Sequence, residues 1–183
     1  VIWNLMYRKT LDYARKGVLV ASISAVDIAI MDLKGKILGL SVADLLGGVF
    51  RKKVKPYATG MYFPDLENTS KNFQKEAEKY INMGFNAIKM KVGLGIKEDF
   101  QNIKLMREII GSDIMLMIDS NHAYNYNEAL SLAKKIEKFD ISWFEEPLSP
   151  EYYEQYAELR KNTIIPIAGG ECEYLRFGFL QLL

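Results

Sequence analysis

The sequence predicts an α/β fold, the first five strands of a (β/α)8-type barrel with a helical segment before them. From residue 54 onward, short apolar runs alternate with amphipathic helical stretches, which is the pattern of βα units with a parallel sheet. Three of the runs end on a carboxylate at equal intervals of 26 residues: Asp119, Glu145 and Glu171. Residues 1–53 show helical spacing instead. We therefore expect a helical part over residues 1–53 and a partial barrel over 54–183.

The first 53 residues are expected to form helices. Apolar residues recur there at helical spacing: Ile23, Val26, Ile30 and Leu33. Gly35 follows them and is predicted to end the helix, because glycine commonly lies just past a helix C-terminus. Ser41 is predicted to cap a short helix over residues 42–46.

Five strands are expected in the remainder, at residues 54–62, 87–92, 114–121, 141–147 and 166–171. Helices with apolar faces separate them, and the last of these is predicted to begin at Ser149 and Pro150, a capping hydroxyl followed by proline. Right-handed crossovers would place the strands side by side in chain order. A closed barrel needs eight strands and about 250 residues, so we expect this chain to be an internal segment of a protein roughly twice as long.

Composition limits the class of partner. The 183 residues include 24 Lys and Arg against 23 Asp and Glu, a net charge of +1. This balance gives no reason to expect nucleic acid or a membrane as a partner, and no apolar run approaches the ~20 residues of a membrane span. The lone cysteine, Cys172, excludes an internal disulfide and favours the cytoplasm. We expect its side chain to be a small buried hydrophobe.

The strand ends carry the candidate chemistry. Barrels place functional groups at the carboxyl ends of their strands, and three carboxylates there, Asp119, Glu145 and Glu171, would suit Mg²⁺. Lys89 and Lys91 share one strand face because side chains alternate along a strand. Inside a barrel, desolvation and like-charge repulsion would lower the pKa of such a lysine toward that of a base. Each carboxylate alone is better explained by a turn, but together at regular strand ends they favour a metal-assisted enzyme.

Two further polar residues come just after Asp119, at the end of the first strand that carries a carboxylate. Asn121 shares a strand face with Asp119, although both residue types also favour turns. His122 is the only histidine of the chain. Its position directly after this strand makes a substrate contact one hypothesis, and a structural or surface role is the alternative.

These motifs carry a family resemblance. The series Lys89-Met-Lys91, Asp119-Ser-Asn121, Trp143-Phe-Glu-Glu-Pro147 and Gly170-Glu171 resembles the enolase superfamily, mandelate racemase/muconate-lactonising group. Residues 25–36 and 45–48 resemble the helical part of its α+β capping domain, so the resemblance covers nearly the whole chain.

The resemblance implies a role for each motif residue. It implies Asp119, Glu145 and Glu171 as Mg²⁺ ligands, with Glu145 rather than Glu146 chosen as the first acid of its motif. Lys91 would be the general base, with Lys89 supporting it electrostatically. Asn121 would contact the substrate or the groups around the metal.

The activity implied is Mg²⁺-dependent abstraction of the proton α to a carboxylate, with stabilisation of the enolate. Dehydration of a small hydroxy or sugar acid is preferred on family frequency, with a racemase, epimerase or cycloisomerase on the same scaffold as alternatives. A catalytically silent fragment that acts only in folding or assembly is the alternative from another class. We expect a homo-oligomer, and we expect the segment alone to be inactive, because the family's Asp/His pair comes from later strands.

Overall fold

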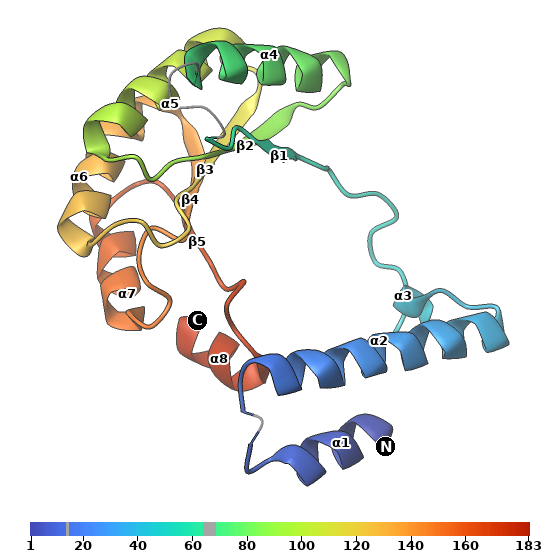
Figure 1. Ribbon diagram of the computed structural model, residues 1–183. Helices are drawn as coiled ribbons and strands as arrows, with labels where there is room; N and C mark the ends of the chain where they lie inside the picture. Colours follow the sequence, from blue (N-terminus) through green and yellow to red (C-terminus); the bar gives the residue numbers. More distant parts are fainter. Residues whose placement is uncertain (14, 64–68) are drawn as a thin grey trace. The chain divides into compact units, whose positions relative to one another are not determined.

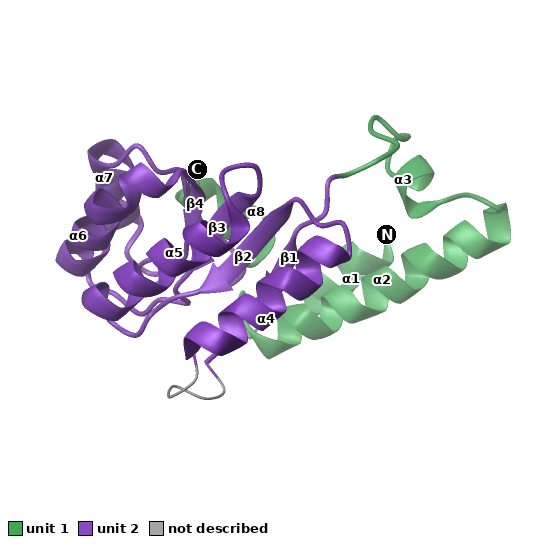
Figure 2. Cartoon of the chain, turned by 90° about the horizontal axis from the view of Figure 1, so that it is seen from above, with its two compact units in different colours: residues 1–54, 173–183 green, residues 55–172 purple. Residues whose placement is uncertain are grey.

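The computed structural model describes residues 1–13, 15–63 and 69–183, which divide into two compact units (Figure 2). Unit 1 comprises residues 1–54 and 173–183, and unit 2 comprises residues 55–172. The change from one unit to the other at 54/55 lies next to the predicted division at 53/54. The assignment of residues 54–183 to one barrel domain stays a prediction.

Unit 2 is built on one parallel sheet, as Figure 1 shows. Its five strands are β1 (Ala58–Gly60), β2 (Ala87–Lys91), β3 (Met115–Asp119), β4 (Ile141–Glu145) and β5 (Ile167–Ala168). They lie in the order β1-β2-β3-β4-β5, the order of right-handed crossovers between neighbours. The predicted fold class is therefore confirmed, although each strand is shorter than its apolar run.

Four helices connect these strands: α4 (Thr69–Asn82), α5 (Ile96–Ile110), α6 (Tyr126–Ile136) and α7 (Tyr153–Asn162). Figure 1 shows them along one face of the sheet. A one-turn 3₁₀ helix, Glu137–Phe139, follows α6. The core lies between helices and sheet, and its largest fully buried side chains include Phe73, Ile103, Leu116, Leu132 and Phe144.

The register of β2 and β3 separates two sets of side chains. Ile88 pairs with Leu116 and Met90 with Ile118, and all four side chains are fully buried in the core. Because side chains alternate along a strand, Lys89 and Lys91 face the opposite side, away from the helices. The apolar residues of β2 thus fix the position of its two lysines.

The amino-terminal ends of β3 and β4 are joined by Arg107 of α5. Its guanidinium donates to the carbonyl oxygens of Gly111, Ile114, Phe139 and Asp140, at 2.7–2.9 Å. Asp140 itself is left-handed, with φ 51°. One side chain therefore provides hydrogen-bond donors for four backbone carbonyl groups.

Two of the predicted helix boundaries are wrong. Ser149 and Pro150 begin a turn closed by the bond from the Tyr152 amide to the Ser149 carbonyl, and α7 begins only at Tyr153. The Ser149 hydroxyl donates to the Glu151 carboxylate rather than capping a helix. In unit 1, Gly35 lies inside a helix instead of ending it.

Unit 1 contains α1 (Ile2–Thr10), α2 (Val18–Leu38), α3 (Val42–Leu45) and α8 (Leu175–Leu182). The left-handed residue that ends α2 is Gly39, with φ 66°. Ser41 caps α3 as predicted, in a reciprocal arrangement with Asp44. None of the described helices is both long enough and apolar enough to cross a membrane.

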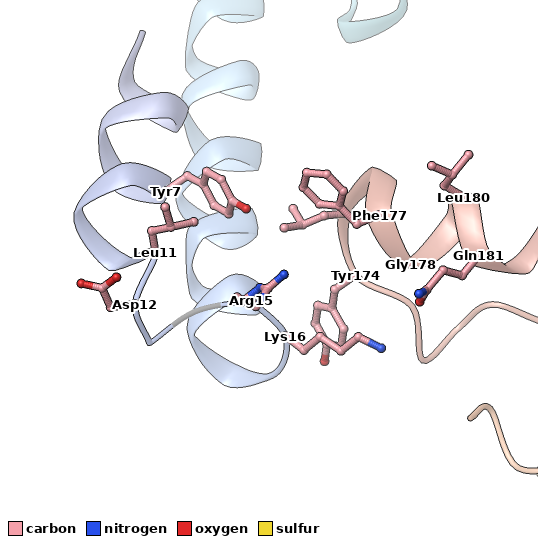
Figure 3. A pocket seen from close by; sticks show the side chains of 11 residues that line it. Tyr7, Leu11, Asp12, Arg15, Lys16, Tyr174, Phe177, Gly178, Leu180 and Gln181 are labelled. Carbon is pink, nitrogen blue, oxygen red and sulfur yellow. The ribbon is translucent and has the colours of Figure 1, made fainter. Parts of the chain in front are cut away.

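A cavity of about 1050 Å³ lies within unit 1 (Figure 3). Aromatic and aliphatic side chains of α1 and α8 line it, together with the charged groups of Asp12, Arg15 and Lys16. The lysines and carboxylates that the sequence singles out all belong to unit 2, so the candidate active site is described there.

Candidate active site

Three predicted site residues lie side by side at the carboxyl ends of adjacent strands. Lys91 of β2 pairs in register with Asp119 of β3, and Asp119 pairs with Glu145 of β4. Each is the last residue of its strand. The parallel register therefore brings together groups that are 28 and 54 residues from Lys91 in the sequence.

Ion pairs join these residues across the strands. The Lys89 ammonium lies 2.5 Å from Glu145 Oε1 and 3.2 Å from Asp119 Oδ2. The Lys91 ammonium donates to Asp119 Oδ2 and to Asn121 Oδ1, both at 2.6 Å. The side chain of Asp119 is 1 % exposed and that of Lys89 is 8 % exposed. Two lysines and two carboxylates thus form one largely buried network.

The network raises the pKa of Lys89. Burial alone lowers that pKa, but the hydrogen bond to Glu145 and the charges of Asp119 and Glu145 outweigh burial, so the pKa lies above its ordinary value. The predicted lowering of a lysine pKa is therefore wrong for Lys89, because carboxylates from two neighbouring strands face it. Its charge is fixed near neutral pH, which is compatible with electrostatic support rather than proton transfer.

Asp119 is held in its ionised form. Burial raises the pKa of this carboxyl, while the hydrogen bonds from Lys91 and from the Asn121 amide, and the charges of both lysines, lower it further. The net pKa lies below the ordinary value. A buried carboxylate that is ionised needs cations beside it, and a bound metal ion would meet the same need.

Glu171 lies beside Glu145, just past the end of the next strand. It lines a cavity of about 330 Å³ together with Trp143, Glu145, Glu146, Ala168 and Gly169. It is exposed, in a turn after β5. The three predicted carboxylates do not bring one oxygen each within 4.8 Å of the others, in contrast to another cluster described below.

The donor chemistry of this site fits Mg²⁺. The Lys89 ammonium lies between the carboxylates of Asp119 and Glu145 and neutralises their charge. Glu171 lines the same cavity as Glu145. All three offer hard carboxylate oxygens, the ligands that Mg²⁺ prefers, and an open cavity leaves room for the water or substrate oxygens it retains.

Two aromatic residues beside the network, Trp143 and Tyr57, have no role in the sequence-based prediction, although Trp143 belongs to one of its motifs. Trp143 Nε1 donates to Glu145 Oε2 at 2.9 Å, and Tyr57 packs edge-on against the Trp143 ring. The Lys89 ammonium lies 5.8 Å from the centre of the Tyr57 ring, within cation–π range. The spacing of Trp143, two residues before Glu145 on one strand, was the available signal.

The loop after β2 is fixed by Asp99, which was also missed. This fully buried carboxylate accepts from the backbone amides of Gly93, Leu94 and Gly95, and from the Tyr124 hydroxyl. Burial and the bond to Asp99 raise the pKa of Tyr124. Because Asp99 accepts from three consecutive amides just after Lys91, it orders the loop that follows this lysine.

His122 and Cys172 meet beside the candidate site. His122 Nε2 lies 3.2 Å from Glu146 Oε2 and 3.6 Å from Cys172 Sγ. The expectation that Cys172 is a buried hydrophobe is wrong, since it is exposed in the turn after β5. Burial, opposed by the nearby His122 and reinforced by the charge of Glu171, raises the pKa of Glu146.

Family profiles match most of the chain. The profile described as "Enolase C-terminal domain-like" matches residues 72–183. The profile described as "Mandelate racemase / muconate lactonizing enzyme, N-terminal domain" matches residues 1–47.

Curated relatives match along the whole chain. It is 42 % identical over 183 residues to D-galactarolactone cycloisomerase of Agrobacterium fabrum, covering 100 % of this chain and 48 % of that protein. It is 37 % identical to arabinonate dehydratase of Saccharolobus solfataricus, with the same two shares.

Solved structures match equally far. The chain is 57 % identical to the 3,6-anhydro-D-galactonate cycloisomerase from Zobellia galactanivorans, with a TM-score of 0.93. The match covers 99 % of this chain and 50 % of the cycloisomerase chain. A racemase from Streptomyces coelicolor A3(2) with bound magnesium is 34 % identical at a TM-score of 0.90, with the same coverage. The chain spans about half the length of the relatives it matches.

Proposed function

The chain belongs to the enolase superfamily, in its mandelate racemase/muconate lactonizing enzyme group, and on that premise we propose that the whole protein is a Mg²⁺-dependent cycloisomerase of an anhydro sugar acid. The observation that carries this proposal is the buried network of Lys89, Lys91, Asp119 and Glu145 at the strand ends. The network supports the proposal because it brings Lys91, the candidate base, next to two carboxylates that favour a cation.

In this proposal Asp119, Glu145 and Glu171 hold the metal, and Lys91 is the base. When bound, Mg²⁺ would stabilise the negative charge that develops on the substrate carboxylate as its α-proton leaves. Lys91 Nζ accepts that proton. Lys89 keeps its charge and supports Lys91 electrostatically.

Lys91 also shares a partner with the metal site. Its ammonium donates to Asp119 Oδ2 in this structure. If Asp119 held a divalent cation, its carboxylate would be shared between that cation and Lys91. Asn121, which accepts from Lys91 at 2.6 Å, would then orient the amine.

Cycloisomerisation and dehydration share this first step. In a 3,6-anhydro sugar acid, the oxygen on C3, β to the carboxylate, is an ether that bridges to C6. After the C2 proton passes to Lys91, the C3–O bond breaks and its electron pair goes to the oxygen. That oxygen takes up a proton and stays attached to C6, so the ring opens without change of mass. In dehydration the C3 hydroxyl takes up a proton and leaves as water.

The degree of similarity favours cycloisomerisation. The chain is 57 % and 42 % identical to two proteins named as cycloisomerases, against 37 % for one named as a dehydratase. Dehydration, preferred from the sequence on family frequency, becomes the second candidate, with arabinonate dehydratase as its support.

The proposal also includes a division of the chain into two domains. We assign residues 1–53 to the capping domain and residues 54–183 to the barrel domain, supported by profile matches over 1–47 and 72–183. The second group that handles protons would come from outside this chain, so the segment alone is expected to be inactive.

The test is incubation of the full-length protein with Mg²⁺ and 3,6-anhydrogalactonate in D₂O, followed by mass spectrometry. Cycloisomerisation predicts a product with the mass of the substrate plus incorporated deuterium. Parallel incubation with non-anhydro sugar acids would give a product lighter by one water if the protein is a dehydratase. Neither product with either substrate class would contradict the proposal and favour the catalytically silent alternative.

A further inference from the structure

A second cluster of possible metal ligands lies in unit 2, beside the carboxylate site. The imidazole of His122, the carboxylate of Glu146 and the sulfur of Cys172 each offer one atom, and these atoms all lie within 4.8 Å of one another. His122 Nε2 lies 3.2 Å from Glu146 Oε2 and 3.6 Å from Cys172 Sγ.

These separations match a tetrahedral zinc site. With Zn–N and Zn–O bonds of about 2.0–2.2 Å and a Zn–S bond of about 2.3 Å, tetrahedral angles place nitrogen about 3.4 Å from oxygen and about 3.6 Å from sulfur. The separations of 3.2 Å and 3.6 Å agree with both values. The third separation, from the Glu146 oxygen to the Cys172 sulfur, is within 4.8 Å, so a cation could bind with modest movement of the side chains.

The hydrogen bond at the other ring nitrogen orients His122 as a ligand. Nδ1 lies 3.1 Å from the Leu148 carbonyl oxygen, which can only accept, so Nδ1 carries a hydrogen. The Nε2 lone pair then faces the Glu146 carboxylate, which is also an acceptor. A proton or a metal ion must lie between them, and an Nδ1–H donated to a backbone carbonyl is typical of metal-ligating histidines.

Glu146 is held in place, with its Oε2 facing His122 Nε2 at 3.2 Å and accepting from Asn121 Nδ2 at 3.4 Å. Its residue is only 2 % exposed. Its backbone carbonyl accepts from the His122 amide and the Ser120 hydroxyl, both at 2.8 Å. His122 and Glu146 both have left-handed backbones, with φ 69° and 44°. Such strain persists only where surrounding contacts enforce it, and here it turns the two side chains toward each other.

We propose that His122, Glu146 and Cys172 form a second metal site, for Zn²⁺ or a similar borderline cation, distinct from the oxygen-only site of Asp119, Glu145 and Glu171. Nitrogen and thiolate donors select zinc, cobalt or copper, whereas Mg²⁺ takes oxygen ligands. Three protein ligands leave a fourth position open. The site does not depend on the proposed reaction, because none of its ligands is a ligand or base in it.

Cobalt titration of the full-length protein tests the site. The reduced, chelator-treated protein, with Mg²⁺ in excess, is titrated with Co²⁺ and followed by absorption. We expect a thiolate-to-cobalt charge-transfer band that saturates at one equivalent and disappears when Zn²⁺ is added. Absence of the band in the unaltered protein would overturn the proposal.

Three variants locate the signal. Cys172→Ser, at an exposed position, should abolish the band, and H122Q should weaken Co²⁺ binding by at least about 10-fold, the loss found even for groups that merely support a ligand. Glu171→Gln is the matched control, adjacent to Cys172 but part of the other site, and should keep the band. Survival of the band in Cys172→Ser, or its loss in Glu171→Gln with the far-ultraviolet circular dichroism unchanged, would contradict a separate site.

Discussion

The ammonium of Lys89 on β2 lies 2.5 Å from the carboxylate of Glu145 on β4, across the intervening strand β3. The same ammonium lies 3.2 Å from Asp119 on β3. One lysine thus neutralises two carboxylates from different strands, at the place where the proposed metal would supply positive charge. Stability and metal binding should therefore be linked at this position.

Replacing Lys89 by methionine should reveal that link. The variant leaves Asp119 and Glu145 facing each other without this cation, and removing one partner of a buried pair costs about 3 kcal/mol or more. We expect the urea unfolding midpoint to fall, and Mg²⁺ to restore part of the loss. An equal effect of Mg²⁺ on variant and unaltered protein would contradict the shared position.

Stability should depend on pH through Asp119. Its pKa in the folded state is depressed, so the stabilisation is complete above the unfolded pKa of about 3.9 and is lost as pH falls through the folded value. In urea titrations across acidic pH, Asp119→Asn should lose less stability on acidification than the unaltered protein. Parallel curves for the two proteins would show that Asp119 does not contribute.

Lys89 should make stability depend on pH on the alkaline side. Its folded pKa is raised, so its stabilisation is present below the unfolded pKa of about 10.4 and is lost as pH rises through the folded value. Unfolding measured in the alkaline range should therefore be steeper in pH for the unaltered protein than for the K89M variant. A steeper curve for K89M would be inconsistent with this sign.

Arg107 should be a major structural residue. Its guanidinium donates to four carbonyl groups between α5 and β4. Because hydrogen bonds to charged groups each contribute about 1.5–3 kcal/mol and several here are partly exposed, Arg107→Met should cost about 2–4 kcal/mol of unfolding free energy. Arg160→Met, at an exposed position of α7, is the matched control and should change stability by less than about 0.5 kcal/mol.

Trp143 should act through Glu145. Its indole nitrogen donates to Glu145 Oε2 at 2.9 Å, and groups that orient a metal ligand typically contribute 10–100-fold to metal affinity or activity. Trp143→Phe should thus weaken Mg²⁺ binding about 10-fold, measured by calorimetry, while the far-ultraviolet circular dichroism stays the same. Unchanged Mg²⁺ affinity would remove Glu145 or this contact from the metal site.

The order of strands was predictable because local and long-range signals agree. Apolar runs such as residues 87–91 and 115–119 lie between amphipathic helices, and parallel βαβ units allow few arrangements. The predicted helix boundaries are wrong where a residue type is common in two different local structures. Ser149 and Pro150 suit both a helix start and a turn. Gly35 is used inside α2 because a Cβ there would lie only 2.8 Å from the Leu40 carbonyl oxygen.

The clustering of Asp119 and Glu145 with the two lysines was predictable from the sequence, but the electrostatics of the cluster were not. Asp119 and Glu145 could be found because each ends an apolar run. The raised pKa of Lys89 depends on which carboxylates face it across the sheet, and register does not follow from one strand's sequence. The approach of Cys172 to His122 likewise depends on the turn after β5 and the left-handed backbone at His122, which local patterns do not encode.

The central claim is that Lys91 is the base, and the direct measurement is exchange of the substrate α-proton with D₂O, followed by NMR in the full-length protein with Mg²⁺. Lys91→Ala should abolish exchange while Mg²⁺ affinity, measured by calorimetry, is retained, and Lys97→Ala, an exposed lysine of α5, should exchange normally. Undiminished exchange in Lys91→Ala would contradict the account and assign proton transfer to another group.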